Sequence, residues 1–472
     1  MSSLSSALSS LLSGSSSSSS INLSEILQAA YGSSSSGIDV SSAVSAALSA
    51  ARAPENTWTS EESTIQSQAS ALTSLQNGVS TLDNDLQSLN SLIGPLNSAS
   101  VASSNSGVVT ASAASGSASG NHVVVVNSLA STASWASGTV ASATTPLAAG
   151  SFTITGADGT TTTISTGSGT STLTDVASTI NADKLGVSAS VITDANGARL
   201  AIVSNTSGAA ANFSVANGGG LTFGQTANGA NASFSVDGLN LASASNTVTG
   251  VIQGVTINLQ SASPGAQVNL NISPNTSQAT SAINQFVSDY NAVITAINNQ
   301  FSDSGSGQGV LATDSTVHNL QSELLTALGY TYTPDSGTTG VPNLSSMGIT
   351  VNKDGTLSVD DATLNNALQN NYSDVQNFFQ GTAFNGFAGS LDQQLTSFLS
   401  PADGAFTVDL QSLSSQYTTL QQDVTNFETN VITPLQTHLQ SDYSQAEILL
   451  QQLPVEMKQI NQELGYNNNS NG

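Results

Sequence analysis

The chain carries the same seven-residue apolar repeat near both of its ends, and this restricts the fold more than any other feature. In the first copy, which begins near Trp58, apolar residues recur at alternating steps of three and four, with Gln68 in one slot. These residues are Ile65, Leu72, Leu75, Val79, Leu82, Leu86, Leu89 and Ile93. The spacing predicts a helix with one apolar stripe, as in a coiled coil. Gly94 and Pro95 are expected to end this helix, which at about 1.5 Å per residue is on the order of 55 Å long.

The second copy lies more than 300 residues later and has two halves. The first half is Leu410, Leu413, Tyr417, Leu420, Val424, Phe427 and Val431, and the second is Tyr443, Ala446, Leu450, Leu453, Met457, Ile460 and Leu464. Between them the step becomes four through Leu435 and Leu439, beside Pro434. This change predicts a local unwinding and a kink or domain boundary. Each repeat alone also fits a helix packed in some other core, but two matching repeats favour an antiparallel helical leg.

Between residues 99 and 275 the apolar period changes from the helical one to strict alternation, which is typical of strands. Alternating pairs and triplets occur at Phe152 and Ile154, Val187 to Val191, Leu200 and Ile202, Val255 to Leu259, and Val268 to Ile272. Turn-forming residues separate them, as at Asp237-Gly238. Leu173, Val176, Ala177 and Ile180 have helical spacing instead. We therefore expect a mostly antiparallel β head with a short helix in an outer subdomain, about residues 145–230.

These patterns predict an α+β fold in which the N- and C-terminal parts form a helical leg and the β head is inserted between them. The leg is assigned to residues 55–98 and 276–439, with a hairpin around Asn352-Lys353-Asp354-Gly355, and the head to residues 99–275. Residues 38–54, expected to end at Pro54, and 440–472 are predicted to be terminal helices. Residues 1–37 are dominated by serine and are predicted to be a disordered leader, interrupted by a short apolar-periodic stretch from Ile21 to Leu27.

The charge balance argues against several classes of partner. The 472 residues include 30 acidic and only 5 basic side chains, a formal net charge of −25. Nucleic acid and anionic membranes are disfavoured, because both bind through clustered Lys and Arg. The longest aliphatic run, Val123 to Val126, is too short to span a bilayer. The first basic residue is Arg52, so no cleavable signal peptide is predicted and an exported chain needs another route.

The residues that carry most enzyme chemistry are scarce. The chain has no cysteine, which removes disulfides, thiolate nucleophiles and Cys-ligated zinc. Its histidines are His122, His318 and His438. His438 and Asp442 share a helical face, but two ligands make a poor metal site, and an exposed helical pair is the better interpretation. We expect no metal and no cofactor.

Other local patterns also favour structural interpretations. Gly218-Gly219-Gly220 lacks the Lys-Ser/Thr of a phosphate-binding loop. The segment from Asn352 to Asp361 has Thr350 where a calcium loop has its first acid, which favours a hairpin. Adjacent acids such as Asp360 and Asp361 point apart and do not suggest a glycosidase pair. The sequence predicts a protein that is not an enzyme.

A series of short motifs follows one order along residues 37–466. They are Gly37-Ile38-Asp39-Val40 through Arg52-Ala53-Pro54, Leu173-Thr174-Asp175-Val176 with Gly186-Val187-Ser188-Ala189, Ser245-Asn246-Thr247-Val248 with Gly254-Val255-Thr256-Ile257, Phe286-Val287-Ser288-Asp289-Tyr290-Asn291, Met347-Gly348-Ile349 through Asp354-Gly355-Thr356-Leu357, and Leu449-Leu450-Gln451-Gln452-Leu453. Together they resemble the flagellar filament cap family, FliD or hook-associated protein 2. The outer-head motifs resemble a β module shared by hook and flagellin proteins.

The resemblance implies a non-enzymatic role outside the cell. Family members pass unfolded through the flagellar secretion apparatus, with an export chaperone, and assemble as a homo-oligomeric ring at the filament tip. There they help flagellin to fold and insert, through a symmetry mismatch that opens one gap at a time. The terminal helices would dock on the filament end, the leg would form the ring wall and the head its plate. The alternatives are an exported surface adhesin with a coiled-coil stalk, or a flagellin or hook–filament junction protein.

Overall fold

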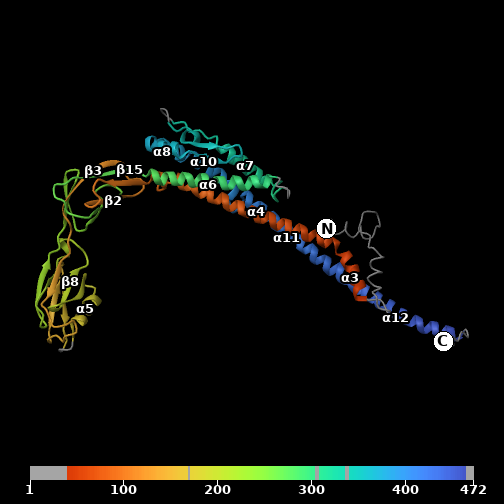
Figure 1. Cartoon of the computed structure of the whole chain (residues 1–472), viewed down its shortest axis with the longest axis horizontal. Helices are drawn as coiled ribbons and strands as arrows, with labels where there is room; N and C mark the ends of the chain where they lie inside the picture. Colours follow the sequence, from red (N-terminus) through yellow and green to blue (C-terminus); the bar gives the residue numbers. More distant parts are fainter. Residues whose placement is uncertain (1–39, 168–170, 303–307, 335–339, 464–472) are drawn as a thin grey trace.

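The computed structural model describes residues 40–167, 171–302, 308–334 and 340–463 and shows a long helical leg with a bent β head at one end (Figure 1). The described elements are helices and antiparallel sheets, so the predicted α+β fold class is confirmed. The N-terminal and C-terminal helices run side by side along the leg. The head is formed by the chain between them (Figure 1).

The leg is built from helices of both chain ends. They are α3 (Val40–Ala51), α4 (Ala53–Asn90), α6 (Thr276–Phe301), α7 (Ser315–Ala327), α8 (Asp361–Asn370), α9 (Tyr372–Gln380), α10 (Phe387–Leu399), α11 (Ala405–Phe427) and α12 (Thr433–Glu463). Helix α4 packs against α6, α10 and α11, and one large core joins these helices. A hairpin of β16 (Ile349–Val351) and β17 (Leu357–Val359) covers part of α6, and this confirms the predicted hairpin.

The inner module of the head lies between the leg and the outer module (Figure 1). It contains a five-stranded sheet in the order β1-β15-β3-β11-β12 and a three-stranded sheet in the order β13-β14-β2. The strands are β1 (Ala99–Ser103), β2 (Val109–Ala113), β3 (Gly120–Ser128), β11 (Ala232–Val236), β12 (Leu239–Ser243), β13 (Thr247–Thr249), β14 (Val255–Leu259) and β15 (Val268–Pro274). Their inward residues, such as Phe234, Ile257 and Leu270, form one core.

The outer module has its own core and contains the predicted short helix, α5 (Leu173–Ala182). Its sheets have the orders β10-β4-β8-β7 and β6-β5-β9. The strands are β4 (Ser134–Ser137), β5 (Ser151–Thr155), β6 (Thr161–Ser165), β7 (Val187–Asp194), β8 (Gly197–Ser204), β9 (Ser214–Val215) and β10 (Phe223–Ala227). Phe152, Ile180 and Leu200 are buried together. Thr172 and Asp175 form a reciprocal capping box that fixes the start of α5.

The chain passes from the leg into the head and back again, and the two crossings lie side by side. Strand β1 follows the 3₁₀ turn η1 (Pro95–Asn97), and its first residue, Ala99, pairs with Pro274 at the end of β15. The Asn275 N–H donates to the Ser98 carbonyl at 2.9 Å, just before α6 begins. The entry and exit strands are therefore neighbours in one sheet.

Helix α4 ends earlier than the repeat predicted. It stops at Asn90, and Ile93 is 81% exposed, so the assignment of Ile93 to the apolar stripe was wrong. Proline cannot donate to a helix and disfavours helical geometry in the residue before it, so the chain must leave the helix ahead of Gly94-Pro95. The side-chain amide of Gln380 donates to the Leu89 and Ser91 carbonyls at 2.8 and 3.2 Å, and this satisfies the helix end.

Two prolines lie at helix starts. Pro54 was expected to close the first helix, but α3 ends at Ala51 and Pro54 lies in the first turn of α4. The first turn tolerates proline because its N–H groups have no partner in the helix.

At the change of step near Pro434, the chain stays helical from α11 to α12 through a π-helical turn, η4 (Glu428–Ile432). A π-helical turn is wider than an α-helical one, so η4 can accommodate the change in the step of the apolar repeat.

Candidate functional site

The structure offers little for chemistry within its described residues. No three His, Cys, Asp or Glu side chains gather there in positions that could hold a metal ion. His438 and Asp442 lie 3.6 Å apart on α12, and both are largely exposed. None of the described helices combines the length and apolar character needed to cross a bilayer. The candidate site is instead the long helical surface of the leg.

The inner leg holds most of the first repeat. We call Leu72, Leu75, Val79, Leu82, Leu86 and Leu89 the inner seam; all are buried, together with side chains of α6, α9 and α10. Phe286 of α6 lies 5.6 Å from Phe387 of α10 between ring centroids, in an edge-on arrangement within the same core. The inner seam is therefore covered by several helices, of which α11 is one.

The outer half of α4 lies against α11 in antiparallel fashion. Trp58 and Phe427 meet edge to face at 5.3 Å between ring centroids, and Gln66 donates to the Tyr417 hydroxyl at 2.8 Å. The predicted residues here are only partly covered. Leu420 and Phe427 are buried, whereas Ile65, Leu410, Leu413, Tyr417, Val424 and Val431 are half-buried.

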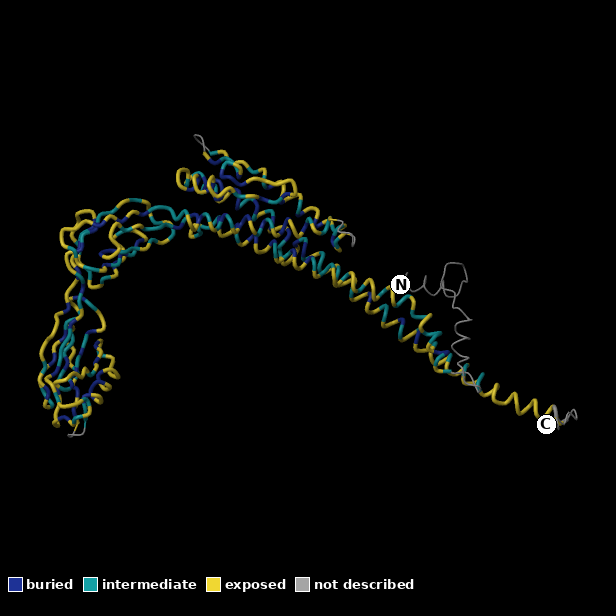
Figure 2. Tube along the Cα trace, viewed as in Figure 1, coloured by how far each residue is buried: buried dark blue, intermediate teal, exposed yellow. Residues whose placement is uncertain are grey.

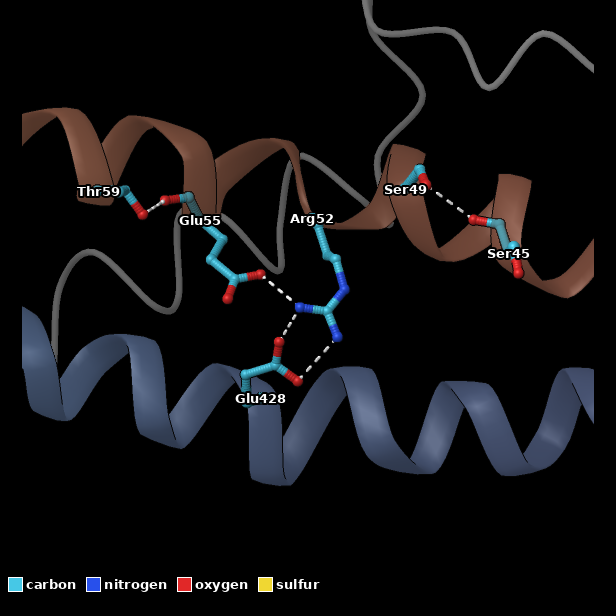
Figure 3. Close-up of polar contacts among 6 residues, drawn as sticks. All are labelled: Ser45, Ser49, Arg52, Glu55, Thr59 and Glu428. Carbon is cyan, nitrogen blue, oxygen red and sulfur yellow. Dashed lines mark hydrogen bonds and ion pairs between the residues drawn. The ribbon is translucent and has the colours of Figure 1, made fainter.

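An ion-pair cluster joins the break between α3 and α4 to the π-helical turn η4 (Figure 3). Arg52 lies between α3 and α4, and its guanidinium contacts both carboxylate oxygens of Glu428, the first residue of the π turn. Arg52 Nη1 also donates to Glu55 Oε2 at 2.9 Å. The hydrogen bond that Arg52 donates to Glu428 is the main reason that the pKa of Arg52 is raised. We call Arg52, Glu55 and Glu428 the clasp.

The inner seam is flanked by carboxyl pairs. Asp83 is 9% exposed; burial and the neighbouring Asp392 of α10 raise its pKa to about 7. Burial and Asp289 of α6 raise the pKa of Asp85 to about 6. Among the described residues, Asp83 Oδ1, Asp85 Oδ2 and Asp392 Oδ1 have no hydrogen-bond donor. A proton shared within each pair would satisfy these oxygens.

The end of α12 lies beyond any described partner helix (Figure 2). Leu450, Leu453, Met457 and Ile460, which the repeat assigns to a seam, are all exposed. Leu464 lies outside the described residues. The structure thus brings the inner seam and part of the α11 residues together, and it leaves this last section of the repeat uncovered.

Sequence reasoning missed the clasp and the carboxyl pairs. Both join residues that are hundreds of positions apart, such as Arg52 and Glu428, and apolar periodicity carries no information about such contacts. One signal was available. With only 5 basic residues in the chain, an Arg at a predicted helix boundary is a candidate for a specific ion pair.

Comparison with known proteins agrees with this architecture. Residues 36–133 match the family model "Flagellar hook-associated protein 2 N-terminus", and residues 229–454 match "Flagellar hook-associated protein 2 C-terminus". Residues 151–206 of the outer module match "Flagellin hook IN motif". The two hook-associated models cover the leg and the inner module, and the third covers much of the outer one.

Individual relatives point to the same family. The B-type flagellar hook-associated protein 2 of Pseudomonas aeruginosa is 26% identical over 366 residues, which are 69% of this chain and 73% of that protein. The lateral flagellar hook-associated protein 2 of Vibrio parahaemolyticus is 30% identical over 39% of this chain and 42% of its own length. The crystal structure of the D1-D2-D3 domains of the Escherichia coli flagellar cap protein FliD matches with a TM-score of 0.57 and 26% identity, over 73% of this chain and 99% of that one. The chain therefore belongs to the flagellar hook-associated protein 2, or FliD, family.

Proposed function

We propose that this protein caps the bacterial flagellar filament. Copies of the chain form a ring at the filament tip and promote the folding and insertion of exported flagellin, without catalysing a reaction. The observation that carries the proposal is the similarity in fold to the Escherichia coli cap protein, which extends over 73% of this chain and includes both leg and head. The adhesin and junction-protein alternatives have no comparable support from the family models.

In this proposal each region of the molecule has a mechanical role. Residues 38–54 and 440–472 dock on the filament end, residues 55–98 and 276–439 form the ring wall, and residues 99–275 form the plate. The exposed apolar side chains of α12 support a docking role, because a helix that ends free of its own fold can be covered by another protein. A mismatch in symmetry between ring and filament would open one insertion gap at a time.

The proposed location is the extracellular tip of the flagellum. The chain would reach it unfolded through the flagellar secretion apparatus, with the help of an export chaperone and without a cleavable signal peptide. The absence of cysteine fits this route, because the chain needs no disulfide formation after export. The net charge of −25 argues against nucleic acid as a partner.

Deletion of the gene tests the proposal. Loss of a cap should leave the cells non-motile or poorly motile, with monomeric flagellin released into the medium, and the wild-type gene supplied in trans should restore filaments. Loss of a flagellin would instead remove flagellin from the medium. Loss of an adhesin would leave swimming intact, and either of these results would contradict a capping role.

A further inference from the structure

Strand β12 is an open edge of the inner module. It is the last strand of the five-stranded sheet, and among the described strands it pairs with β11 alone. Asp237 and Gly238, which both have positive φ, form the two-residue turn between β11 and β12. Leu239 is 66% exposed and Leu241 is half-buried. An exposed apolar edge strand is a template for pairing with another strand.

The backbone of β12 carries hydrogen-bonding groups that point away from its sheet. In a two-residue hairpin, the residues that flank the turn exchange both backbone hydrogen bonds, and this pattern repeats at every second residue. Phe234 and Leu241 form the next such pair. The N–H and C=O groups of Asn240 and Ala242 therefore point to the open side of β12. No described residue forms a hydrogen bond with them.

The apolar face of the sheet continues onto β12. Residues that are directly opposite on paired strands lie on the same face, so Leu239 and Leu241 share the face of Val236 and Phe234. Val236 and Phe234 are buried in the core that joins the two sheets of the inner module. The core therefore reaches β11 fully and covers β12 only in part. A further strand beside β12 would cover its two leucines.

The inner module carries almost no charge, although the whole chain has a net charge of −25. Residues 86–157 and 238–288 contain no Asp, Glu, Lys or Arg. The acid nearest to β12 in the sequence is Asp237, and its carboxylate lies 2.8 Å from His122 Nδ1. Two copies of so acidic a chain repel each other, so an uncharged edge is where they can approach most closely. An uncharged strand such as β12 itself fits this edge.

We propose that β12 pairs with β12 of a second copy, antiparallel and about a twofold axis at Leu241. In this register Asn240 lies opposite Ala242 of the second copy, so all the outward backbone groups of both strands are used, in four hydrogen bonds. Leu241 lies opposite its own counterpart, and each Leu239 is diagonal to that pair, so four leucines form one cluster.

This twofold contact is separate from the proposed ring and does not rest on the capping function. In a ring of more than two copies, neighbours meet through two different surfaces. A contact about a twofold axis uses the same surface on both copies, so it joins two chains and then closes. It would also remove the open edge of β12 from solution.

Single cysteines test the register, because the wild-type chain has none to interfere. Leu241→Cys places two thiols directly opposite each other, within reach of a disulfide. Leu239→Cys is the matched control: this position is more exposed, but its counterpart lies about 14 Å away in the proposed register. Under mild oxidation the full chain with Leu241→Cys should form a covalent dimer at least five-fold faster than the control. Equal rates, or a faster control, would overturn the proposal.

A proline at the edge provides a second, independent measurement. Ala242→Pro removes an outward N–H that β11 does not use, so β12 can keep its place in the sheet while its pairing with a second copy is blocked. Ala242→Ser is the matched control.

Sedimentation equilibrium of the full chains, at a salt concentration that screens the net charge, compares these variants. The wild type and Ala242→Ser should dimerise, and Ala242→Pro should raise the dimer dissociation constant at least ten-fold. Circular dichroism checks that each variant is folded. A wild type that stays monomeric at high micromolar concentration, or a folded Ala242→Pro that dimerises equally well, would contradict the β12 contact.

Discussion

The inner leg and the outer leg carry the same apolar repeat and bury it to very different degrees. Leu82 of the inner seam is 0% exposed, whereas Leu453 near the end of α12 is 48% exposed. The difference lies in the number of partners. In the inner leg, helix α4 packs against α6, α9, α10 and the start of α11. The outer half of α4 packs mainly against α11, and the end of α12 meets no described helix. A repeat thus identifies the face that seeks a partner, but not whether the chain itself supplies one.

The largest expected effect comes from the same substitution placed in each region. Leu82→Asp should destabilise the leg by about 3–5 kcal/mol, because it buries an unpaired charge among apolar side chains. Leu420→Asp, at the more open α4–α11 contact, should also destabilise it, by less. Leu92→Asp, at a leucine just beyond α4 that is 65% exposed, is the matched control and should change stability by less than about 0.5 kcal/mol. Denaturant unfolding followed by circular dichroism measures all three.

The head should survive these substitutions, because its two modules have their own cores. The isolated 99–275 fragment is the reference for the head signal. If this fragment fails to fold alone, the division into leg and head is wrong.

A second prediction uses pH to separate the regions. In the folded leg the pKa of Asp83 is raised to about 7 and that of Asp85 to about 6, so the folded state holds protons that the unfolded chain has released. Their stabilisation is complete below the ordinary pKa near 3.8 and is lost as pH rises through the raised values. Leg stability should therefore fall by a few kcal/mol between about pH 4.5 and 8.

Asp83→Asn should flatten this profile and make the leg more stable at pH 8, because the amide imitates the protonated acid. Asp158→Asn, at an exposed turn of the head, is the control and should leave the leg profile unchanged. A leg that gains stability as pH rises would contradict the assignment of shared protons.

A smaller effect is expected at the clasp. Glu428→Gln should weaken the α3–α12 contact by about 0.5–1 kcal/mol, because the Arg52–Glu428 pair is bidentate but partly exposed. The change should be confined to the outer leg and should fade at high salt. Amide exchange of α3 measures it, with Glu61→Gln on the exposed side of α4 as the control. Equal loss of protection in the inner leg would show that the clasp acts on the whole leg.

The smallest effect concerns contacts between copies. Each chain brings 30 acidic and only 5 basic side chains, a net charge of −25, so neighbouring copies repel one another. Salt screens charges over about 8 Å at 0.15 M, and mild acid neutralises carboxylates, so either should strengthen self-association a few-fold. Analytical ultracentrifugation across salt and pH measures this. Oligomers that dissociate as salt is added would instead indicate specific ion pairs between copies.

Periodicity explains which parts of the fold could be predicted from sequence. The alternation at Phe152 and Ile154 or at Val268 to Ile272 identifies strands because one face of each is buried. The step of three and four identifies α4 and α11 for the same reason. The exact helix end was missed at Ile93, where the local demands of Gly94-Pro95 prevail over the repeat.

The candidate site was only partly predictable. The residues of the inner seam face a core as their spacing indicates. The partners of Asp83 and Arg52, in contrast, are Asp392 and Glu428, which approach only after the leg has folded. Polar contacts of this kind have no period, so a single sequence does not indicate which distant residue will complete them.

The two neighbouring strands that join head to leg have a consequence for how such chains can evolve. Ala99 and Pro274 are paired, so the two ends of the head lie side by side. For the folding of the leg, the whole head is therefore equivalent to a loop between two neighbouring residues. Loop-closure entropy grows only with the logarithm of loop length, so lengthening or exchanging the inserted segment hardly alters the leg. A short β-turn in place of residues 100–273 should leave the leg able to close. The head is therefore free to diversify while the leg stays the same.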